Sequence, residues 1–391
     1  MTAARRIAAF AAATTVAAIG LSSLAPAQAA DRFGDPNATI GGPLLADPGV
    51  AVRGPALPPI HAKAWLVADV DTGDVLAAYH AHWRLRPAST LKTLTAVMLL
   101  PRLQPSTVYR AQYADAVVDG SLVGLVPGAT YTVNDLFYGL FLPSGNDAAH
   151  ALAELSGGVR HTVTLMQDEA DHLQADDTHV VNPHGLDAPG QVTSAYDLAL
   201  FARAGLARPD FRRYCSTITY AFPGRKPKKP GAKRGTYQIY NQNPMLVDGF
   251  NGAIGVKTGY TTLAGRTFVG AATRHGDTLV ATLLGIRDSS AADAEALLSW
   301  GFRNGDRIRP VGQLVDPEGV TGATLGHPAS APVQPQISGV TAQAPHTLVD
   351  AGKWVLVVLL ALAGTLWVRR RLTMRRRERA RAQRQQRVLR H

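Results

Sequence analysis

The 391-residue chain contains a single cysteine, Cys215, and few charged residues, 18% of the total. One cysteine excludes an intrachain disulfide framework and a metal site built from cysteine ligands. No group of His, Asp and Glu has the spacing of a metal site either. The low charge content, together with 46% hydrophobic residues, excludes global disorder and allows a large packed core.

Excess basic charge is absent from most of the chain, although the formal net charge is +11. Residues 369–391 alone hold eleven Arg and one Glu, and Arg5 and Arg6 lie near the start. The residues between these two ends are therefore close to neutral. This distribution argues against a body that binds nucleic acid.

The start of the chain has the order of a cleavable signal peptide. Arg5 and Arg6 precede an apolar stretch over about residues 7–24, and the small-residue site Ala27-Gln28-Ala29 follows. We predict that residues 1–29 are a signal peptide and that the mature protein is exported. An uncleaved anchor is the alternative.

A second apolar run lies near the other end. Residues 351–368 are just long enough to cross a hydrocarbon core, with Trp354 and Trp367 near the borders and the Arg-rich residues 369–391 directly after. This pattern predicts a single-pass transmembrane helix over 351–368 with a basic cytoplasmic tail over 369–391. The rest of the mature chain is then extracytoplasmic at the plasma membrane. Nucleic-acid binding by the tail is the competing interpretation.

Two stretches with few aromatic residues frame the middle of the chain. Residues 30–60 contain six Pro and five Gly and, apart from Phe33, no aromatic residue, which predicts a flexible lead-in. Residues 317–349 contain five Pro and no aromatic residue, Lys or Arg, which predicts a stalk. The head is then one large domain over 61–316, without internal repeats.

Strand patterns occur at both ends of the head. Segments 64–70 and 75–79 flank the turn sequence Asp71-Thr72-Gly73-Asp74 and predict a hairpin. Three more strands are expected over 253–257, 266–273 and 278–284. Helices are expected over 89–100, across much of 132–210, and over 290–302. This order predicts one antiparallel sheet built from both halves of the chain, with a helical insertion between them.

Ser89 and Lys92 lie three residues apart on the first predicted helix. Such positions share a helix face, and a desolvated lysine can be the base that makes a serine hydroxyl nucleophilic. Backbone N–H groups at the helix start could also stabilise an oxyanion. By itself the pattern is common, since a serine N-cap is often followed by a lysine one turn later.

Two further segments combine polar residues with turn signals. Ser144-Gly145-Asn146 follows the point where one helical stretch stops, and a turn with an N-cap would also explain it. Lys257-Thr258-Gly259 ends a strand and can present a cation and a hydroxyl to a carboxylate, with Gly259 permitting close backbone approach. An edge lysine before a bend is the alternative.

Lysine is rare in this chain: only eight of the 40 basic residues are Lys. Yet Lys stands at both motif positions, 92 and 257, where Arg could hold a charge but could not act as a base.

Together these segments follow the order Ser-x-x-Lys, Ser-x-Asn, Lys-Thr-Gly of the penicillin-interacting serine enzymes. Over about residues 60–305 the chain resembles the D-alanyl-D-alanine carboxypeptidases of the low-molecular-weight penicillin-binding protein family, serine peptidases with the β-lactamase/DD-peptidase fold. Further segments typical of that family lie at 86–89, 182–187, 194–198, 241–243 and 255–265.

The resemblance implies a role for each motif residue. Ser89 would be the acylated nucleophile and Lys92 its general base, while Ser144 would relay a proton to the leaving D-alanine. Asn146 would hydrogen-bond the substrate amide. The substrate-binding residues would be Lys257, Thr258, Gly259 and Tyr260: the first two bind the terminal carboxylate, and the backbone N–H groups of Ser89 and Tyr260 form the oxyanion hole. No cofactor or metal is required, and His184 is expected to be structural.

The resemblance also implies the fold and the reaction. The expected fold is an α/β sandwich (α+β) with a five-stranded antiparallel sheet flanked by helices and a helical subdomain. The expected activity is removal of the terminal D-alanine from peptidoglycan stem peptides through a Ser89 acyl-enzyme, with β-lactam antibiotics as covalent inhibitors. The second, β-rich domain of many relatives is expected to be absent, and Thr267 stands where relatives often carry cysteine.

Three other functions stay open. A D,D-endopeptidase would use the same residues. A class A-like β-lactamase would need a deacylating Glu with Asn four residues on, but Glu154 and Glu169 are followed at that distance by Gly158 and Leu173. An inactive wall-binding module would not need Lys92 beside Ser89.

The basic run over 225–234 is expected to be a solvated hairpin tip, with contact to an anionic wall polymer as the alternative. Cys215 is expected to be buried.

Overall fold

The computed structural model describes residues 40–46, 48–225, 227, 231–287 and 290–319. The predicted signal peptide, transmembrane helix and basic tail, and nearly all of the predicted stalk, lie outside these residues. Within the described ranges, no helix is long and apolar enough to cross a membrane.

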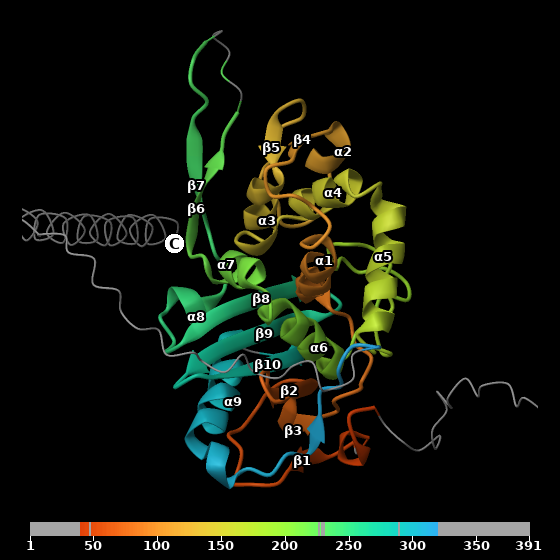
Figure 1. Cartoon of the computed structure of the whole chain (residues 1–391), viewed down its shortest axis with the longest axis vertical. Helices are drawn as coiled ribbons and strands as arrows, with labels where there is room; N and C mark the ends of the chain where they lie inside the picture. The colour runs from red at the N-terminus through yellow and green to blue at the C-terminus, as the bar shows by residue number, and fades with distance from the viewer. Residues whose placement is uncertain (1–39, 47, 226, 228–230, 288–289, 320–391) are drawn as a thin grey trace, which may run out of the picture. The chain divides into compact units, whose positions relative to one another are not determined.

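An antiparallel sheet of seven strands forms the centre of the head (Figure 1). Its strand order is β1 (Val50–Val52), β3 (Asp74–Tyr79), β2 (Ala64–Asp69), β10 (Asp277–Ile286), β9 (Gly265–Arg274) and β8 (Ala253–Thr261), with β11 (Gly312–Gln313) also paired to β3. The predicted hairpin and the three later strands are confirmed. The expectation of five strands is wrong because β1 and β11 also pair with β3 at the edge, and strands this short carry no alternation pattern.

Side chains of the central strands alternate between two hydrophobic cores. In β2, Leu66 and Ala68 join the core that contains helices α1 (Lys92–Leu99) and α6 (Ala195–Leu206). Trp65 and Val67 point to the other face, which α9 (Ser290–Asn304) covers (Figure 1). Because helices cover both faces, the central strands are almost continuously apolar.

The helical part of the head follows β3 in the chain and lies beyond one side of the sheet (Figure 1). Its elements are η2 (Ala88–Leu91), α1, β4 (Val108–Arg110), α2 (Tyr113–Ala116), β5 (Thr130–Thr132), α3 (Val133–Phe141), α4 (Asn146–Leu155), α5 (Val159–His172), α6 and α7 (Pro209–Ser216). Thr132 begins α3 with a capping box, in which its hydroxyl accepts from the Asp135 N–H and Asp135 accepts from the Thr132 N–H. The predicted helical middle is confirmed.

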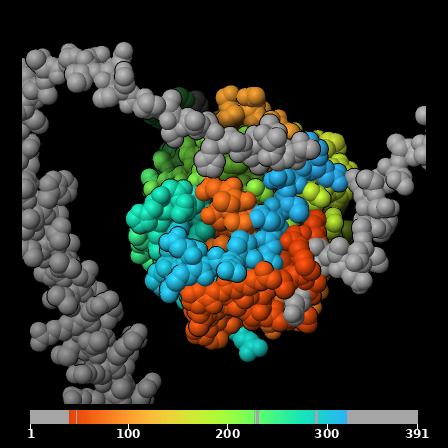
Figure 2. Space-filling model, turned by 60° about the horizontal axis from the view of Figure 1, so that its bottom comes forward, coloured from red at the N-terminus to blue at the C-terminus, as the bar shows by residue number. Residues whose placement is uncertain are grey.

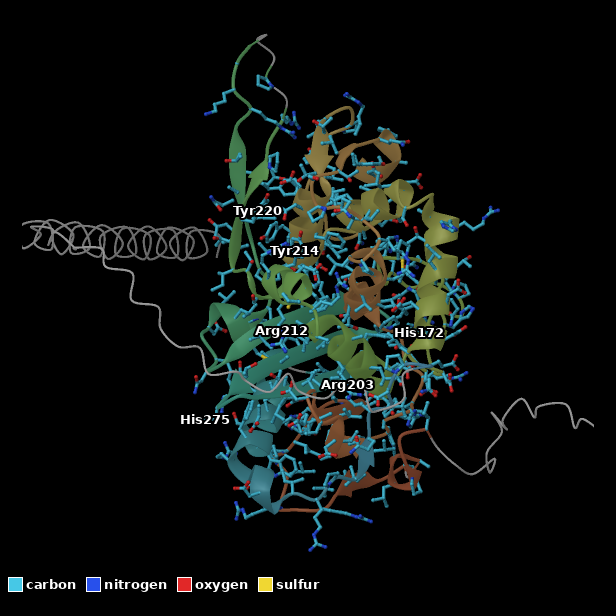
Figure 3. The ribbon with its side chains drawn as sticks, in the orientation of Figure 1. His172, Arg203, Arg212, Tyr214, Tyr220 and His275 are labelled. Carbon is cyan, nitrogen blue, oxygen red and sulfur yellow. The ribbon has the colours of Figure 1, made fainter. Side chains whose placement is uncertain are left out.

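The hairpin of β6 (Thr219–Pro223) and β7 (Thr236–Tyr240) projects away from the sheet, as predicted for the strands around the basic run (Figure 1). Stacked tyrosines hold its base. The rings of Tyr138 and Tyr220 are 3.9 Å apart, and Tyr214 of α7 packs edge-on against Tyr138 at 4.8 Å. Tyr214 and Tyr220 are labelled in Figure 3. Short helix α8 (Pro244–Val247) then leads into β8.

Residues before and after the predicted head also pack against it. Leu45, in the short helix η1 (Pro43–Leu45), is buried, and the Gln313 N–H donates to the Gly41 carbonyl at 2.8 Å. The earliest and latest described residues therefore lie side by side on one face (Figure 2). Over residues 40–46 and 48–60 this differs from the flexible lead-in expected over residues 30–60, because β1 pairs with β3 at the edge of the sheet.

Candidate active site

The first motif sits where the chain enters α1. Ser89 lies in the single turn η2, and Lys92 is the first residue of α1, with a fully buried side chain. Ala88 has a left-handed backbone (φ 47°), which makes the entry sharp. Lys92 Nζ lies 2.9 Å from Ser89 Oγ. The predicted pair is thus in direct contact.

Lys92 Nζ has two further oxygen partners. Asn146 Oδ1 lies 2.6 Å away, and the backbone carbonyl of His184 lies 2.8 Å away. Neither oxygen can donate, so both must accept N–H bonds from the amine. A neutral amine has two N–H bonds and one lone pair, and these two partners use both N–H bonds. The lone pair is then left for the hydroxyl proton of Ser89, which is the arrangement that a general base needs.

The electrostatics favour this neutral amine. Burial lowers the pKa of Lys92 well below the usual value, the charge of Lys257 lowers it further, and Asp147 partly opposes the shift. Lys257 is also buried, and that burial lowers its pKa to about 7. Two lysines that share one buried site cannot both hold a proton cheaply, which supports the deprotonated state of Lys92.

The second motif lies between α3 and α4. Ser144 has a left-handed backbone (φ 63°), and Asn146 is the first residue of α4. Besides its contact with Lys92, Asn146 donates from Nδ2 to the Asp119 carbonyl at 2.6 Å. The hydroxyl of Ser144 is buried and has no hydrogen-bond partner among the described residues. It is therefore available to a substrate or to a transferred proton.

Asp147 holds the loop that covers this motif, a role that the sequence did not indicate. Its buried carboxylate accepts the backbone N–H groups of Val123, Gly124 and Leu125 at 2.7–2.9 Å. The loop over 119–125 also contributes the Ser121 carbonyl, which accepts the Asn146 N–H at 2.6 Å. These bonds fix the backbone around Asn146 and so aim its side chain at Lys92.

The third motif lies on β8 at the edge of the sheet. Lys257 is buried, whereas the side chain of Tyr260 is 63% exposed. Gly259 allows the closest approach between β8 and η2: a Cβ atom there would stand 2.8 Å from the Ser89 backbone nitrogen. β8 therefore lies directly against the nucleophile, as the resemblance implied.

The loop over 182–187 completes the surroundings of Lys92. A Cβ atom on Gly185, whose φ is +85°, would stand 1.9 Å from the Ala88 carbonyl oxygen, so only glycine fits there. The neighbouring His184 supplies its carbonyl to Lys92. Burial is the main cause that lowers the pKa of the His184 ring to about 3, so the ring stays neutral. Sequence reasoning missed this contact because a backbone carbonyl leaves no signal in residue identity.

Thr267 of β9 holds the turn before the nucleophile. Its buried hydroxyl donates to the Pro87 carbonyl at 2.8 Å. The same Oγ1 would stand 2.3 Å from a Cβ atom on Gly259. The residue that departs from the family pattern thus lies between β8 and the Ser89 turn and bonds directly to that turn.

The three predicted motifs therefore form one site, made of η2 and α1, the start of α4, and β8. It offers a hydroxyl nucleophile with a buried amine beside it, an unpartnered hydroxyl at Ser144, and a second buried lysine at Lys257. This set suits acyl transfer to serine. Among the described residues, no three side chains of His, Cys, Asp or Glu are grouped to hold a metal ion.

Comparison with known proteins gives a consistent picture. The model of a family described as D-alanyl-D-alanine carboxypeptidase (peptidase family S11) matches residues 51–288. The D-alanyl-D-alanine carboxypeptidase DacB2 of Mycobacterium tuberculosis is 39% identical over 253 residues, which cover 63% of this chain and 84% of that protein. DacD of Escherichia coli is 36% identical over 265 residues, which cover 64% of this chain and 65% of that protein.

A solved structure is similar to this chain in fold as well as in sequence. The crystal structure of a D-alanyl-D-alanine carboxypeptidase from M. tuberculosis matches with a TM-score of 0.61 at 37% sequence identity. The match covers 66% of this chain and 97% of that one. The expected DD-peptidase fold, an α+β fold with an antiparallel sheet, is thereby confirmed.

Proposed function

The chain belongs to the D-alanyl-D-alanine carboxypeptidase family and is a serine peptidase of that family, and on this premise we propose which residues carry the reaction. Ser89 attacks the carbonyl carbon of the penultimate D-alanine of a peptidoglycan stem peptide while Lys92 Nζ takes the hydroxyl proton. The observation that carries this assignment is the 2.9 Å contact between the serine hydroxyl and the amine of Lys92, whose pKa is lowered by burial.

The remaining steps use groups that already surround the nucleophile. The peptide C–N bond breaks, and the leaving D-alanine takes a proton relayed from Lys92 through Ser144. The backbone N–H groups of Ser89 and Tyr260 hold the oxyanion. Water then attacks the acyl ester while Lys92 takes a proton from it. The ester C–O bond breaks, Lys92 passes that proton to Ser89 Oγ, and the shortened peptide is released.

Substrate binding is assigned to β8 and to Asn146. Lys257 and Thr258 bind the terminal carboxylate of the substrate. A bound carboxylate would favour the protonated form of Lys257, whose pKa of about 7 lies within reach of neutral pH. Asn146 hydrogen-bonds the substrate amide. A β-lactam presents a carboxylate and a strained amide to the same groups, so it should acylate Ser89 and leave slowly.

We also propose that the enzyme acts outside the cell while anchored to the plasma membrane. Support comes from the sequence alone: the signal-peptide pattern over 1–29, the apolar run over 351–368 and the basic residues over 369–391. The predicted stalk over residues 317–349 would then link the head to the membrane.

The decisive experiment measures D-alanine release from a peptide that ends in Lys-D-Ala-D-Ala. The detergent-solubilised full-length protein is compared with its Ser89→Ala and Lys92→Arg variants. Release by the parent and loss of at least about 1,000-fold in both variants is expected, since each lacks nucleophile or base. Activity that survives Ser89→Ala would refute the assignment.

Two controls separate the related reactions. A cross-linked stem-peptide dimer tests D,D-endopeptidase activity, and a chromogenic cephalosporin tests β-lactamase activity. Covalent labelling by fluorescent penicillin reports acylation of Ser89 independently of the leaving group. Rapid cephalosporin turnover without D-alanine release would favour the β-lactamase instead.

A further inference from the structure

A second concave surface lies at the end of the sheet where β8 turns into β9. The aromatic groove, as we call it, has a volume of about 800 Å³ and is lined by Lys63, Trp65, Tyr79, His80, Trp83 and Arg287, among others. It lies where β2 starts and where β3 and β10 end. The mechanism proposed above uses none of these residues.

Stacked rings form one wall of this groove. The rings of Tyr79 and His80 stack at 3.9 Å, and His80 meets Trp83 at 4.3 Å. His80 has a left-handed backbone (φ 49°), an uncommon state for a residue other than glycine, and its carbonyl accepts the Trp83 N–H at 2.9 Å. This tight turn holds Trp83 against the stacked rings of Tyr79 and His80, while 52% of the Trp83 surface remains exposed. A large apolar ring kept at the surface in this way suits a ligand with a flat apolar face.

Basic side chains border the rings. Lys63 and Arg287 are both exposed, and neither forms an ion pair with another described residue. Lys63 crosses Gly285 of β10, where an added Cβ atom would stand 2.8 Å from the lysine Cδ. The groove therefore combines exposed aromatic rings with positive charge, and it suits a ligand with apolar ring faces and carboxylates.

A smaller groove continues this surface toward Arg86, which lies three residues before Ser89. It has a volume of about 280 Å³ and shares Lys63 and Leu85 with the aromatic groove. It extends to Arg86 and to Leu263 in the β8–β9 turn. Arg86 lies 3.9 Å from the Asp187 carboxylate, which also accepts a hydrogen bond from Thr261 of β8 at 3.0 Å. The two grooves thus form a continuous path toward β8.

The separation between the two grooves and Ser89 lies within the length of a stem peptide. Leu85 lines both grooves and precedes Ser89 by four residues, so their Cα atoms are at most about 14 Å apart. A five-residue stem peptide spans up to about 17 Å when extended. A stem peptide whose last residues lie at Ser89 can therefore reach the aromatic groove with its sugar-linked end.

We propose that the aromatic groove binds the glycan strand to which the substrate peptide is attached. Sugar rings stack on Trp83 and His80, and free carboxylates of the stem peptide near the glycan lie against Lys63 and Arg287. This inference rests on the proposed function, because it deepens the substrate assignment of the same enzyme. It makes the enzyme selective for stem peptides on polymerised wall over free peptides.

The test compares two substrates that end in the same residues. One is an uncross-linked glycan strand carrying pentapeptides, and the other is the pentapeptide alone. The full-length protein, Trp83→Ala, and the control Tyr113→Ala, which removes an exposed aromatic from α2 outside both grooves, are assayed for D-alanine release. The ratio of kcat/KM for strand over free peptide should fall at least about fivefold in Trp83→Ala, through KM, and stay unchanged in the control.

A direct binding measurement makes the two hypotheses separable. Glycan strands stripped of their peptides should compete with the strand substrate in the parent protein and lose that effect in Trp83→Ala. An unchanged substrate ratio in a folded Trp83→Ala, or equal competition by an inorganic polyphosphate, would overturn the glycan assignment. Absence of D-alanine release from either substrate by the parent would instead refute the proposed function, and quenching of tryptophan fluorescence by stripped strands would still test the groove.

Discussion

Gly259 provides the sharpest test of how β8 is placed against the nucleophile. In Gly259→Ala, the new Cβ atom would stand 2.8 Å from the Ser89 nitrogen, 3.0 Å from the Thr90 nitrogen and 2.3 Å from Thr267 Oγ1. An ordinary contact needs about 3.4 Å or more. Since two of these neighbours are backbone atoms and the third is a hydroxyl bonded to Pro87, the strand must move by roughly half an ångström or more.

That displacement acts on the oxyanion donors, because the Ser89 and Tyr260 N–H groups face each other across this contact in the proposed mechanism. A misplacement of about 1 Å can reduce a rate by about 100-fold, and overpacking costs about 1–3 kcal/mol of stability. We expect the acylation rate with fluorescent penicillin to fall about 30- to 100-fold, with a lower Tm.

The matched control is Gly305→Ala, which makes the same chemical change where an added Cβ atom meets nothing within 4 Å. It should keep both the acylation rate and the Tm. If Gly259→Ala acylates within about twofold of the parent, then β8 does not press on Ser89 and the geometric reasoning fails.

Three further predictions follow from other parts of the structure. Thr267→Val removes one of the two hydroxyls that donate to the buried Pro87 carbonyl, the other being that of Thr90. It should lower the free energy of unfolding in urea by about 0.5–1.5 kcal/mol and also lower the acylation rate. Unchanged values of both quantities would contradict this prediction. The pKa of Lys257, lowered to about 7 by burial, means that the unfolded chain binds more protons above neutral pH, so the free energy of unfolding should rise with pH from 7.5 to 9.5 by up to about 1.4 kcal/mol per unit, and Lys257→Met should show a smaller slope. Removal of residues 351–391 should move the protein from the membrane fraction to the soluble fraction while penicillin labelling persists; retention in the membrane would refute the anchor.

Periodicity in the sequence was sufficient for the main elements of the fold. The strands around 64–79 and 253–284 are apolar because both faces of the sheet are covered, and the turn sequence at 71–74 marks the first hairpin. The short strands β1 and β11 were missed because three and two residues cannot show a period. Their positions depend on the edge of β3, which only the folded sheet provides.

For the site, residue identity predicted which side chains would take part in the reaction, and the fold determines the contacts between them. Ser89 and Lys92 share one helical turn, so their contact follows from local geometry. Their contact with Asn146 joins residues 54 positions apart, and the contact with the His184 carbonyl joins residues 92 positions apart. Long-range packing creates these contacts, and no local pattern reports them.

The sequence by itself therefore predicted Ser89 as the nucleophile, Lys92 as its base and the order of the three motifs, from residue types whose chemistry suits those roles and from the family resemblance. Only the tertiary structure accounts for the lowered pKa of Lys92. Burial between α4, the 182–187 loop and the second lysine lowers its pKa, and desolvation depends on neighbours from every part of the head. The aromatic groove likewise comes from residues around 57–85 and 287 that meet only when β10 pairs with β2.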